Sequence, residues 1–225
     1  MVEKTVLSAA EAAAKIKEGM TLQVGGFLGC GSPDGIIAAL AAAGTRGLTL
    51  VANDTSILDS KSGKGNGVVP LIVNKQFSRV IVSHIGTNAE TQRQMNAGEL
   101  VVDLVPQGTL AERIRAAGNG LGGFLTPTGV GTEVEQGKQV LTIGDHVFLL
   151  ELPLPGDVAI VKAKTADKAG NLRYSKTARN FNPLMASACS IVIAEVEEIV
   201  EIGEIDPDDV HTPSIFVHFL VQSAK

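Results

Sequence analysis

Between Val24 and Pro33 the chain reads Val-Gly-Gly-Phe-Leu-Gly-Cys-Gly-Ser-Pro. The apolar stretch 21–24 leads into this segment, and the Ala-rich stretch 36–43 follows it and ends at Gly44. A short apolar run predicts a buried strand, and an apolar run closed by glycine predicts a helix with a C-terminal cap. We therefore predict a strand, a glycine-rich loop and a helix in succession, which is the unit from which α/β folds are built.

The alternation continues towards the C-terminus. A capped helix is predicted over 88–97, and Thr109 with Glu112 forms a capping box that predicts the start of another helix. Strands that are apolar on both faces and alternate with helices predict an open, mostly parallel sheet with helices on both faces. The stretches that predict these further strands are 48–52, 79–83 and 101–105.

The two ends of the chain complete this pattern. Ser8 and Glu11 form a capping box that predicts a helix ending at Gly19. Beyond Thr132 the chain becomes rich in β-type sequence, and we find no linker that divides residues 1–225, so we predict a single domain. The predicted strands of this C-terminal third are 139–143 and 146–150, joined as a hairpin through Gly144-Asp145, followed by 158–164 and 191–194.

Composition excludes several classes of protein. Hydrophobic residues make up 44% of the 225 residues and charged residues 19%, which provides a substantial core and excludes a disordered chain. The 19 Lys and Arg against 24 Asp and Glu give a formal charge of −5, and the basic residues are scattered, so we expect no nucleic-acid partner. No apolar run approaches the roughly 18 to 20 residues that cross a bilayer, and the N-terminus lacks a signal-peptide pattern. We therefore expect a cytoplasmic protein with no membrane partner.

The chain has two cysteines, Cys30 and Cys189, far apart in the sequence and in no metal-like spacing. We therefore expect neither a disulfide nor a metal site, and we expect both side chains to be mostly buried.

The glycine-rich segment has two interpretations. A glycine loop that leads into a helix exposes backbone N–H groups at the helix N-terminus and so favours an anion. The dinucleotide fingerprint is not matched, because Asp34 stands where Gly29 and Gly31 would need a third glycine. The alternative is a tight, closely packed crossover that requires positive φ angles. The segment by itself leaves both open.

Six segments, in this order along the chain, resemble family I coenzyme A transferases, specifically their α subunit. The resemblance extends along nearly the whole chain and is strongest to the α chains of acetoacetate and short-chain fatty acid transferases. The resemblance implies the open α/β fold shared with ribose-5-phosphate isomerase, and transfer of coenzyme A (CoA) from an acyl-CoA to a free carboxylate. The segments are 24–33, 52–54, 83–88, 105–110, 120–131 and 178–183.

The resemblance also implies which parts of the enzyme this chain lacks. In the family, a Glu carboxylate of the β subunit, within a Ser-Glu-Asn-Gly segment, attacks the thioester and forms a covalent intermediate. This chain contains no such segment, so we expect a β-subunit partner, an α2β2 assembly and no tightly bound cofactor, with the CoA thioester as substrate. The expected donors are acetyl-CoA, acetoacetyl-CoA or succinyl-CoA. Four other glutamates are expected to be structural or solvated: Glu99, Glu112, Glu151 and Glu195.

The resemblance assigns site residues within this chain. Gln107 follows a predicted buried strand, where open α/β sheets place their ligands, and it matches a family Gln beside the reacting acyl group. We predict that its amide stabilises an oxyanion or positions the acyl group. Asn53 is predicted to orient the substrate, and Gly122 and Gly123 belong to a loop predicted to close over it. The glycine loop resembles the family's CoA-binding loop, and the alternative is that it supports the catalytic Glu of the partner. The residues predicted to bind CoA are Gly25, Gly26, Phe27, Leu28, Gly29, Cys30 and Gly31.

His84 and Arg179 are the remaining residues for which the sequence predicts a location. We expect His84 to lie in the core or at a subunit contact, and Arg179 to form a surface salt bridge. The alternative function is a sugar-phosphate module that binds phosphate at the glycine loop and uses Asp34 or Asp54 as general base. The order of the six segments favours the transferase.

Overall fold

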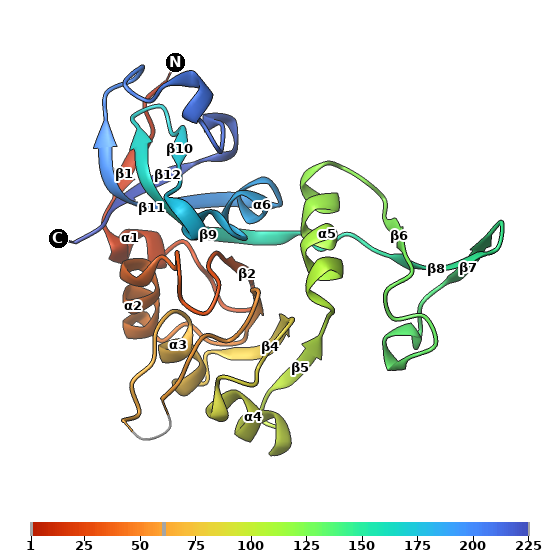
Figure 1. Cartoon of the computed structure of the whole chain (residues 1–225). Helices are drawn as coiled ribbons and strands as arrows, with labels where there is room; N and C mark the ends of the chain where they lie inside the picture. The colour runs from red at the N-terminus through yellow and green to blue at the C-terminus, as the bar shows by residue number, and fades with distance from the viewer. Residues whose placement is uncertain (1, 60–61, 225) are drawn as a thin grey trace.

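The computed structural model describes residues 2–59 and 62–224 (Figure 1). The N-terminal part alternates strands and helices as predicted. Its elements are β1 (Thr5–Leu7), α1 (Ala9–Ala13), β2 (Thr21–Val24), α2 (Asp34–Ala43), β3 (Leu48–Val51), α3 (Val69–Val73), β4 (Phe77–Val82), α4 (Ala89–Asn96), β5 (Val101–Leu104) and α5 (Gln107–Gly118).

The C-terminal part is rich in strands, also as predicted. Its elements are β6 (Phe124–Thr126), η1 (Glu133–Glu135), β7 (Val140–Ile143), β8 (His146–Glu151), β9 (Gly156–Asp167), β10 (Leu172–Arg173), η2 (Lys176–Arg179), α6 (Asn182–Ser187), β11 (Cys189–Val200), η3 (Pro207–Asp209), η4 (Ser214–Phe216) and β12 (Phe219–Gln222).

Most strands form one sheet in the order β1-β12-β11-β9-β2-β3-β4-β5, in which every neighbouring pair is parallel. Only β10 joins it antiparallel, against β9. From β2 the chain crosses through α2 to β3, whereas from β9 it crosses through α6 to β11 on the other side. The strand order therefore reverses between β9 and β2, and open α/β sheets bind ligands beyond the carboxyl ends of their strands at such a point.

Helices cover both faces of this sheet, which confirms the predicted fold class. Alternate residues of β9 show the two faces: Val158 and Ile160 pack with α1, α2 and α3, whereas Ala159 and Val161 pack with α5 and α6. All four residues are fully buried. Because the strand is buried on both sides, its sequence is continuously apolar rather than alternating.

Two predicted helix ends differ from the structure. The capping box of Ser8 and Glu11 is present, but the α-helix ends at Ala13, well before Gly19. The predicted capping box of Thr109 and Glu112 is wrong, because α5 already begins at Gln107. Proline disfavours the helical conformation in the residue before it and itself suits a helix start, so Pro106 sets this boundary.

The C-terminal strands divide between two sheets. The predicted hairpin is present as β7 and β8, and with β6 it forms a separate antiparallel sheet in the order β6-β8-β7. The strands predicted over 158–164 and 191–194 are longer than expected, at 12 residues each, and join the main sheet as β9 and β11. The parallel sheet therefore continues through the C-terminal third of the chain.

The two cysteines are free, and they differ in exposure. Cys189 is partly buried, and burial raises the pKa of its thiol. Cys30 is exposed, contrary to the prediction, because it lies at the end of a tight turn on the surface. In the described part of the chain, no three His, Cys, Asp or Glu side chains are grouped so that they could hold a metal ion, and no helix is both long and apolar enough to span a bilayer.

Candidate active site

A cavity of about 350 Å³ lies at the carboxyl edge of β2, β3 and β4, beside the first residue of α5. It brings together four segments that are far apart in the sequence and that the sequence analysis selected separately. The carboxyl ends of parallel strands are where this type of fold places its ligands. The residues that line the cavity are Phe27, Leu28, Asn53, Asp54, Ser83, His84 and Gln107.

Asn53 is the centre of the polar contacts in this cavity. Its side-chain oxygen accepts a hydrogen bond from the Nε2 of Gln107 (2.7 Å) and another from the hydroxyl of Ser83 (3.2 Å). The Ser83 hydroxyl also donates to the backbone carbonyl of Asn53 (2.7 Å). Asn53 is 2% exposed, whereas Ser83 is partly buried and Gln107 is exposed at the mouth of the cavity. The contact with Asn53 fixes the orientation of the Gln107 amide. The strand before Gln107, β5, lies at the edge of the sheet and is only partly buried, so the prediction of a buried strand there is wrong.

Asp54 connects the end of β3 to the glycine loop. Its carboxylate accepts hydrogen bonds from the backbone amides of Leu28 (2.9 Å) and Ser56 (2.7 Å) and from the Nδ2 of Asn53 (2.6 Å). Asp54 is 4% exposed. Three donors thus engage its two oxygens. Asp54 therefore holds the glycine loop against the end of β3, and its oxygens are not free to accept a proton from a substrate.

The glycine loop contains a two-residue turn at its tip. Phe27 and Cys30 exchange both of their backbone hydrogen bonds, at 3.0 and 2.9 Å. The two residues between them have positive φ angles, 48° at Leu28 and 84° at Gly29, which is the conformation of a type I′ turn. This turn places Phe27 and Leu28 against the cavity and leaves Phe27 39% exposed.

The glycines on either side of the turn permit close packing against the segment 178–182. A Cβ atom on Gly25 would lie 1.8 Å from the Oδ1 of Asn182, and one on Gly31 would lie 2.8 Å from the backbone oxygen of Ala178. The Nδ2 of Asn182 in turn donates to the carbonyls of Gly31 (3.0 Å) and Ala178 (2.8 Å). The close-packing interpretation therefore holds at Gly25 and Gly31.

The N-terminus of α2, which the glycine loop leads to, already holds an anionic group of this chain. The carboxylate of Glu195 accepts from the backbone amide of Ile36 (2.9 Å) and from the Nζ of Lys162 (3.0 Å), and Glu195 is 3% exposed. Burial, together with the nearby carboxylate of Glu195, raises the pKa of Asp34 at the same helix end. A phosphate at this position would displace Glu195, which argues against the sugar-phosphate module.

The other predicted residues lie in different places. His84 is exposed and lines the cavity, so its predicted place in the core is wrong, while the predicted subunit contact stays a prediction. It lies two residues beyond the end of β4, at the edge where the strands end. Arg179 forms no ion pair within the described residues and lies near Tyr174 and His211. Gly122 and Gly123 do not line the cavity.

The four glutamates have structural partners. Glu195 is buried as described, and Glu151 is buried beside Lys138. Glu112 pairs with Arg115, and Glu99 pairs with Lys75 and Arg93. These contacts agree with the expected structural or solvated roles of all four.

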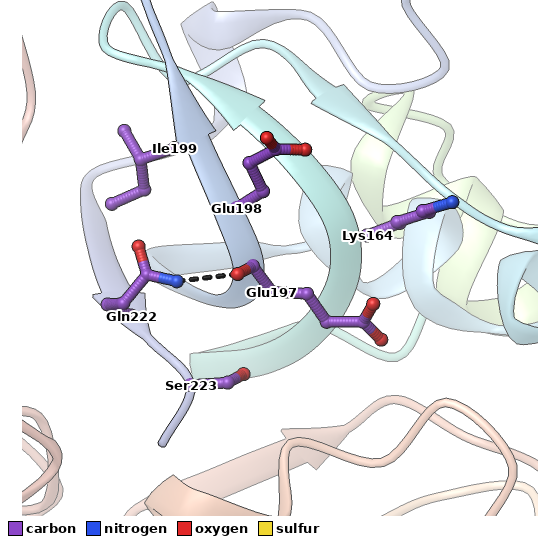
Figure 2. A pocket seen from close by; sticks show the side chains of 6 residues that line it. All are labelled: Lys164, Glu197, Glu198, Ile199, Gln222 and Ser223. Carbon is purple, nitrogen blue, oxygen red and sulfur yellow. Dashed lines mark hydrogen bonds between the residues drawn. The ribbon is translucent and has the colours of Figure 1, made fainter. Parts of the chain in front are cut away.

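Sequence reasoning missed Ser83 and the cavity position of His84. Both lie within two residues of the end of an apolar strand, as Asn53 does, so the rule that ligands bind beyond strand ends could have selected them. A second hollow, of about 490 Å³, lies at the ends of β9, β11 and β12 and is lined by none of the predicted site residues (Figure 2). Its lining residues are Lys164, Glu197, Glu198, Ile199, Gln222 and Ser223.

The sequence profile described as "Coenzyme A transferase" matches residues 6–223. The chain is 52% identical over 209 residues to the α subunit of the acetate CoA-transferase of Escherichia coli K12, covering 93% of this chain and 92% of that protein. It is 50% identical over 222 residues to one subunit of the probable succinyl-CoA:3-ketoacid coenzyme A transferase of Bacillus subtilis 168, covering 99% of this chain and 91% of that protein.

Among solved structures, the acyl-CoA transferase YdiF of Escherichia coli O157:H7, in a thioester complex with CoA, has the same fold with a TM-score of 0.87 at 22% identity. The alignment covers 98% of this chain but 47% of that one, so this chain spans about half the length of YdiF. The profile match and the identity to the two curated relatives both extend over nearly all of the sequence. From these matches we conclude that the chain belongs to the coenzyme A transferase family.

Proposed function

We propose that this chain is the α subunit of a CoA-transferase that is active only with a β subunit, in an α2β2 assembly in the cytoplasm. The reaction moves CoA between a short-chain acyl-CoA and a short-chain carboxylate or 3-oxoacid. The names of the relatives support this proposal, since one belongs to an acetate CoA-transferase and the other to a probable succinyl-CoA:3-ketoacid transferase.

One observation carries the proposal. Among the described residues that line the cavity, Asp54 is the only carboxylate, and three hydrogen-bond donors already hold it. The cavity therefore offers an amide that can bind a substrate oxygen but no free carboxylate that can attack a thioester. A partner must supply the nucleophile.

The proposed chemistry is ping-pong. The partner's Glu carboxylate attacks the thioester carbonyl, the C–S bond breaks, and an acyl-glutamyl anhydride and the CoA thiolate form. The thiolate then attacks the glutamyl carbonyl, which releases the first carboxylate and leaves a glutamyl-CoA thioester. A second carboxylate reverses these two steps. No step requires a net proton transfer, so the site needs no general acid or base.

Gln107 is proposed to stabilise the oxyanion formed in each attack. Its side-chain nitrogen carries two N–H groups, and Asn53 accepts one of them at 2.7 Å. The other N–H is then oriented for a substrate oxygen. A donor that is fixed before the reaction stabilises developing charge without reorganising.

The glycine loop is proposed to contribute one wall of the CoA site through Phe27 and Leu28, which line the cavity. The predicted CoA contacts of the glycines and Cys30 belong to the same proposal. Substrate contact by Gly122 and Gly123 has less support, because neither residue lines the cavity.

Complementation tests the proposed function. The purified chain is mixed with a β-subunit chain that carries a Ser-Glu-Asn-Gly segment, and CoA transfer from acetoacetyl-CoA to acetate is measured. We expect activity from the mixture and none from either chain alone, because the two halves of the site lie on different chains. Turnover by this chain alone would show that the nucleophile has been assigned to the wrong chain.

Substitution of Gln107 tests the role of its amide. We expect Gln107→Ala to slow turnover more than tenfold, a loss of at least about 1.4 kcal/mol of transition-state stabilisation, with assembly unchanged. Gln136→Ala is the matched control, since Gln136 is exposed and does not line the cavity. Steady-state kinetics and size-exclusion chromatography check both variants. An unchanged rate for Gln107→Ala would remove this residue from the site.

A further inference from the structure

The three-stranded sheet stands out from the body of the molecule beyond α5 (Figure 1). Its central strand, β8, pairs with β6 through Leu125↔Leu150 and with β7 through Leu141↔Phe148. Alternate residues of a strand point to opposite faces, so this register decides which side chains share a face.

One face of this sheet is covered by the chain itself around Leu149. Leu149 points to this face and is fully buried. The segment between β6 and β7 packs over it, and a Cβ atom on Gly129 would contact Val134 and the Cδ1 of Leu149. The register places Thr126, Val140, Thr142 and Val147 on this face with Leu149. Away from Leu149 the face is open, since Val140 is 44% and Val147 39% exposed.

The opposite face is mostly apolar, and the described chain leaves it partly or largely exposed. Leu125 is 38% exposed and Ile143 is 55% exposed, and the other three apolar residues of this face are only partly buried. An antiparallel sheet normally presents polar residues on its solvated face. Apolar side chains exposed side by side on a sheet that stands out from the body favour burial against a partner. We call it the outer face; its apolar residues are Leu125, Leu141, Ile143, Phe148 and Leu150, and the exposed His146 lies on it opposite Ile143.

A hollow of about 390 Å³ adjoins the outer face at Leu150. Arg113 and Lys138 line it, and both approach the buried carboxylate of Glu151, at 4.0 and 2.5 Å. Two cations and one carboxylate leave this hollow with a net positive charge. It is therefore complementary to an acidic side chain beside an apolar surface.

We propose that the outer face docks on the β subunit, which presents an apolar surface with an acidic residue at its edge. This inference rests on the proposed function, which requires such a partner. The choice of this occupant follows from the comparisons: the curated relatives are single subunits of about this length, whereas the YdiF chain is about twice as long. A second chain of similar size would correspond to the half of YdiF that this chain does not match.

The size of the outer face determines how strongly a substitution on it should weaken β-subunit binding. Three strands about 5 Å apart, with about four residues each at 3.4 Å, cover roughly 200 Å². A stable interface buries about 800 Å² on each partner. The outer face therefore accounts for only part of the interface, and the body of the molecule provides the remaining buried area. A charge placed on the outer face should weaken the complex rather than abolish it.

Ile143→Lys tests the docking surface, with Thr142→Lys as its matched control. Both residues lie on β7 and are exposed, but they point to opposite faces of the sheet. We expect Ile143→Lys to weaken β-subunit binding at least tenfold, measured by surface plasmon resonance, and Thr142→Lys to change it less than twofold. The thermal melting of each isolated variant should match that of the unsubstituted chain, since both side chains are already in solvent.

The outcomes separate this inference from the proposed function. If the unsubstituted chains form an active complex and Ile143→Lys binds as tightly as before, the outer face is not the docking surface while the proposed function stands. If the two unsubstituted chains neither bind each other nor transfer CoA, the proposed function is wrong, and the docking proposal that rests on it is wrong with it. If Ile143→Lys instead separates a dimer of this chain and leaves β-subunit binding intact, the outer face joins two copies of the chain and the proposal is wrong.

Discussion

Gly25→Ala is expected to destabilise the folded chain by about 4 kcal/mol, a large part of the 5 to 15 kcal/mol that typical domains possess. The new methyl group would lie 1.8 Å from the Oδ1 and 2.6 Å from the Cγ of Asn182. Asn182 is fully buried, and its Oδ1 accepts from the backbone amide of Lys162 (2.9 Å). Moving its side chain breaks this bond and those to Gly31 and Ala178, and each buried polar group left unpaired costs about 1 to 3 kcal/mol.

Urea unfolding followed by circular dichroism measures this loss. Gly122→Ala is the control, because a Cβ atom there meets nothing within 4 Å, and we expect a change of less than about 0.5 kcal/mol. Asn182→Ala in the Gly25→Ala background tests the cause. With the clashing amide removed, adding the methyl group should cost less than about 1 kcal/mol relative to Asn182→Ala alone. Additive losses from the two substitutions would rule out the steric explanation.

Glu195→Gln is the second substitution with a large expected effect, a loss of about 3 kcal/mol in the free energy of unfolding. The Glu195 carboxylate accepts from Lys162, from the hydroxyl of Ser223 (3.1 Å) and from the first turn of α2. The side chain of Lys162 is only 17% exposed. Removing the negative charge therefore leaves a mostly buried ammonium group without its counter-ion, and breaking such a pair typically costs about 3 to 5 kcal/mol.

Glu112→Gln provides the matched control for Glu195→Gln. Glu112 pairs with Arg115 at the surface, where the two side chains are 44% and 42% exposed, so its loss should cost less than about 1 kcal/mol. Denaturant titration of both variants makes the comparison. Equal, small losses would show that the buried pair contributes no more than a surface pair and that other contacts hold the N-terminus of α2.

The local patterns of the sequence predicted most of the fold. The runs over 21–24 and 36–43 correspond to β2 and α2, and the latter ends at Gly44 in the left-handed conformation that glycine favours. The capping pattern gave the wrong start for α5, because Pro106 begins this helix at Gln107, before the predicted cap at Thr109. The local patterns also could not place β9 and β11, because an apolar run is equally compatible with either sheet.

The alternation of strands and helices, the glycine loop and the family resemblance can all be recognised in the sequence, since each depends on patterns within short segments. The site cannot, because it is assembled from side chains that are distant in the chain. The amide of Gln107 meets Asn53 across 54 residues, and Glu195 reaches the amide of Ile36 across 159. Such contacts depend on strand order and register, which place distant strand ends at one edge of the sheet, and residue periodicity carries no information about which strands become neighbours.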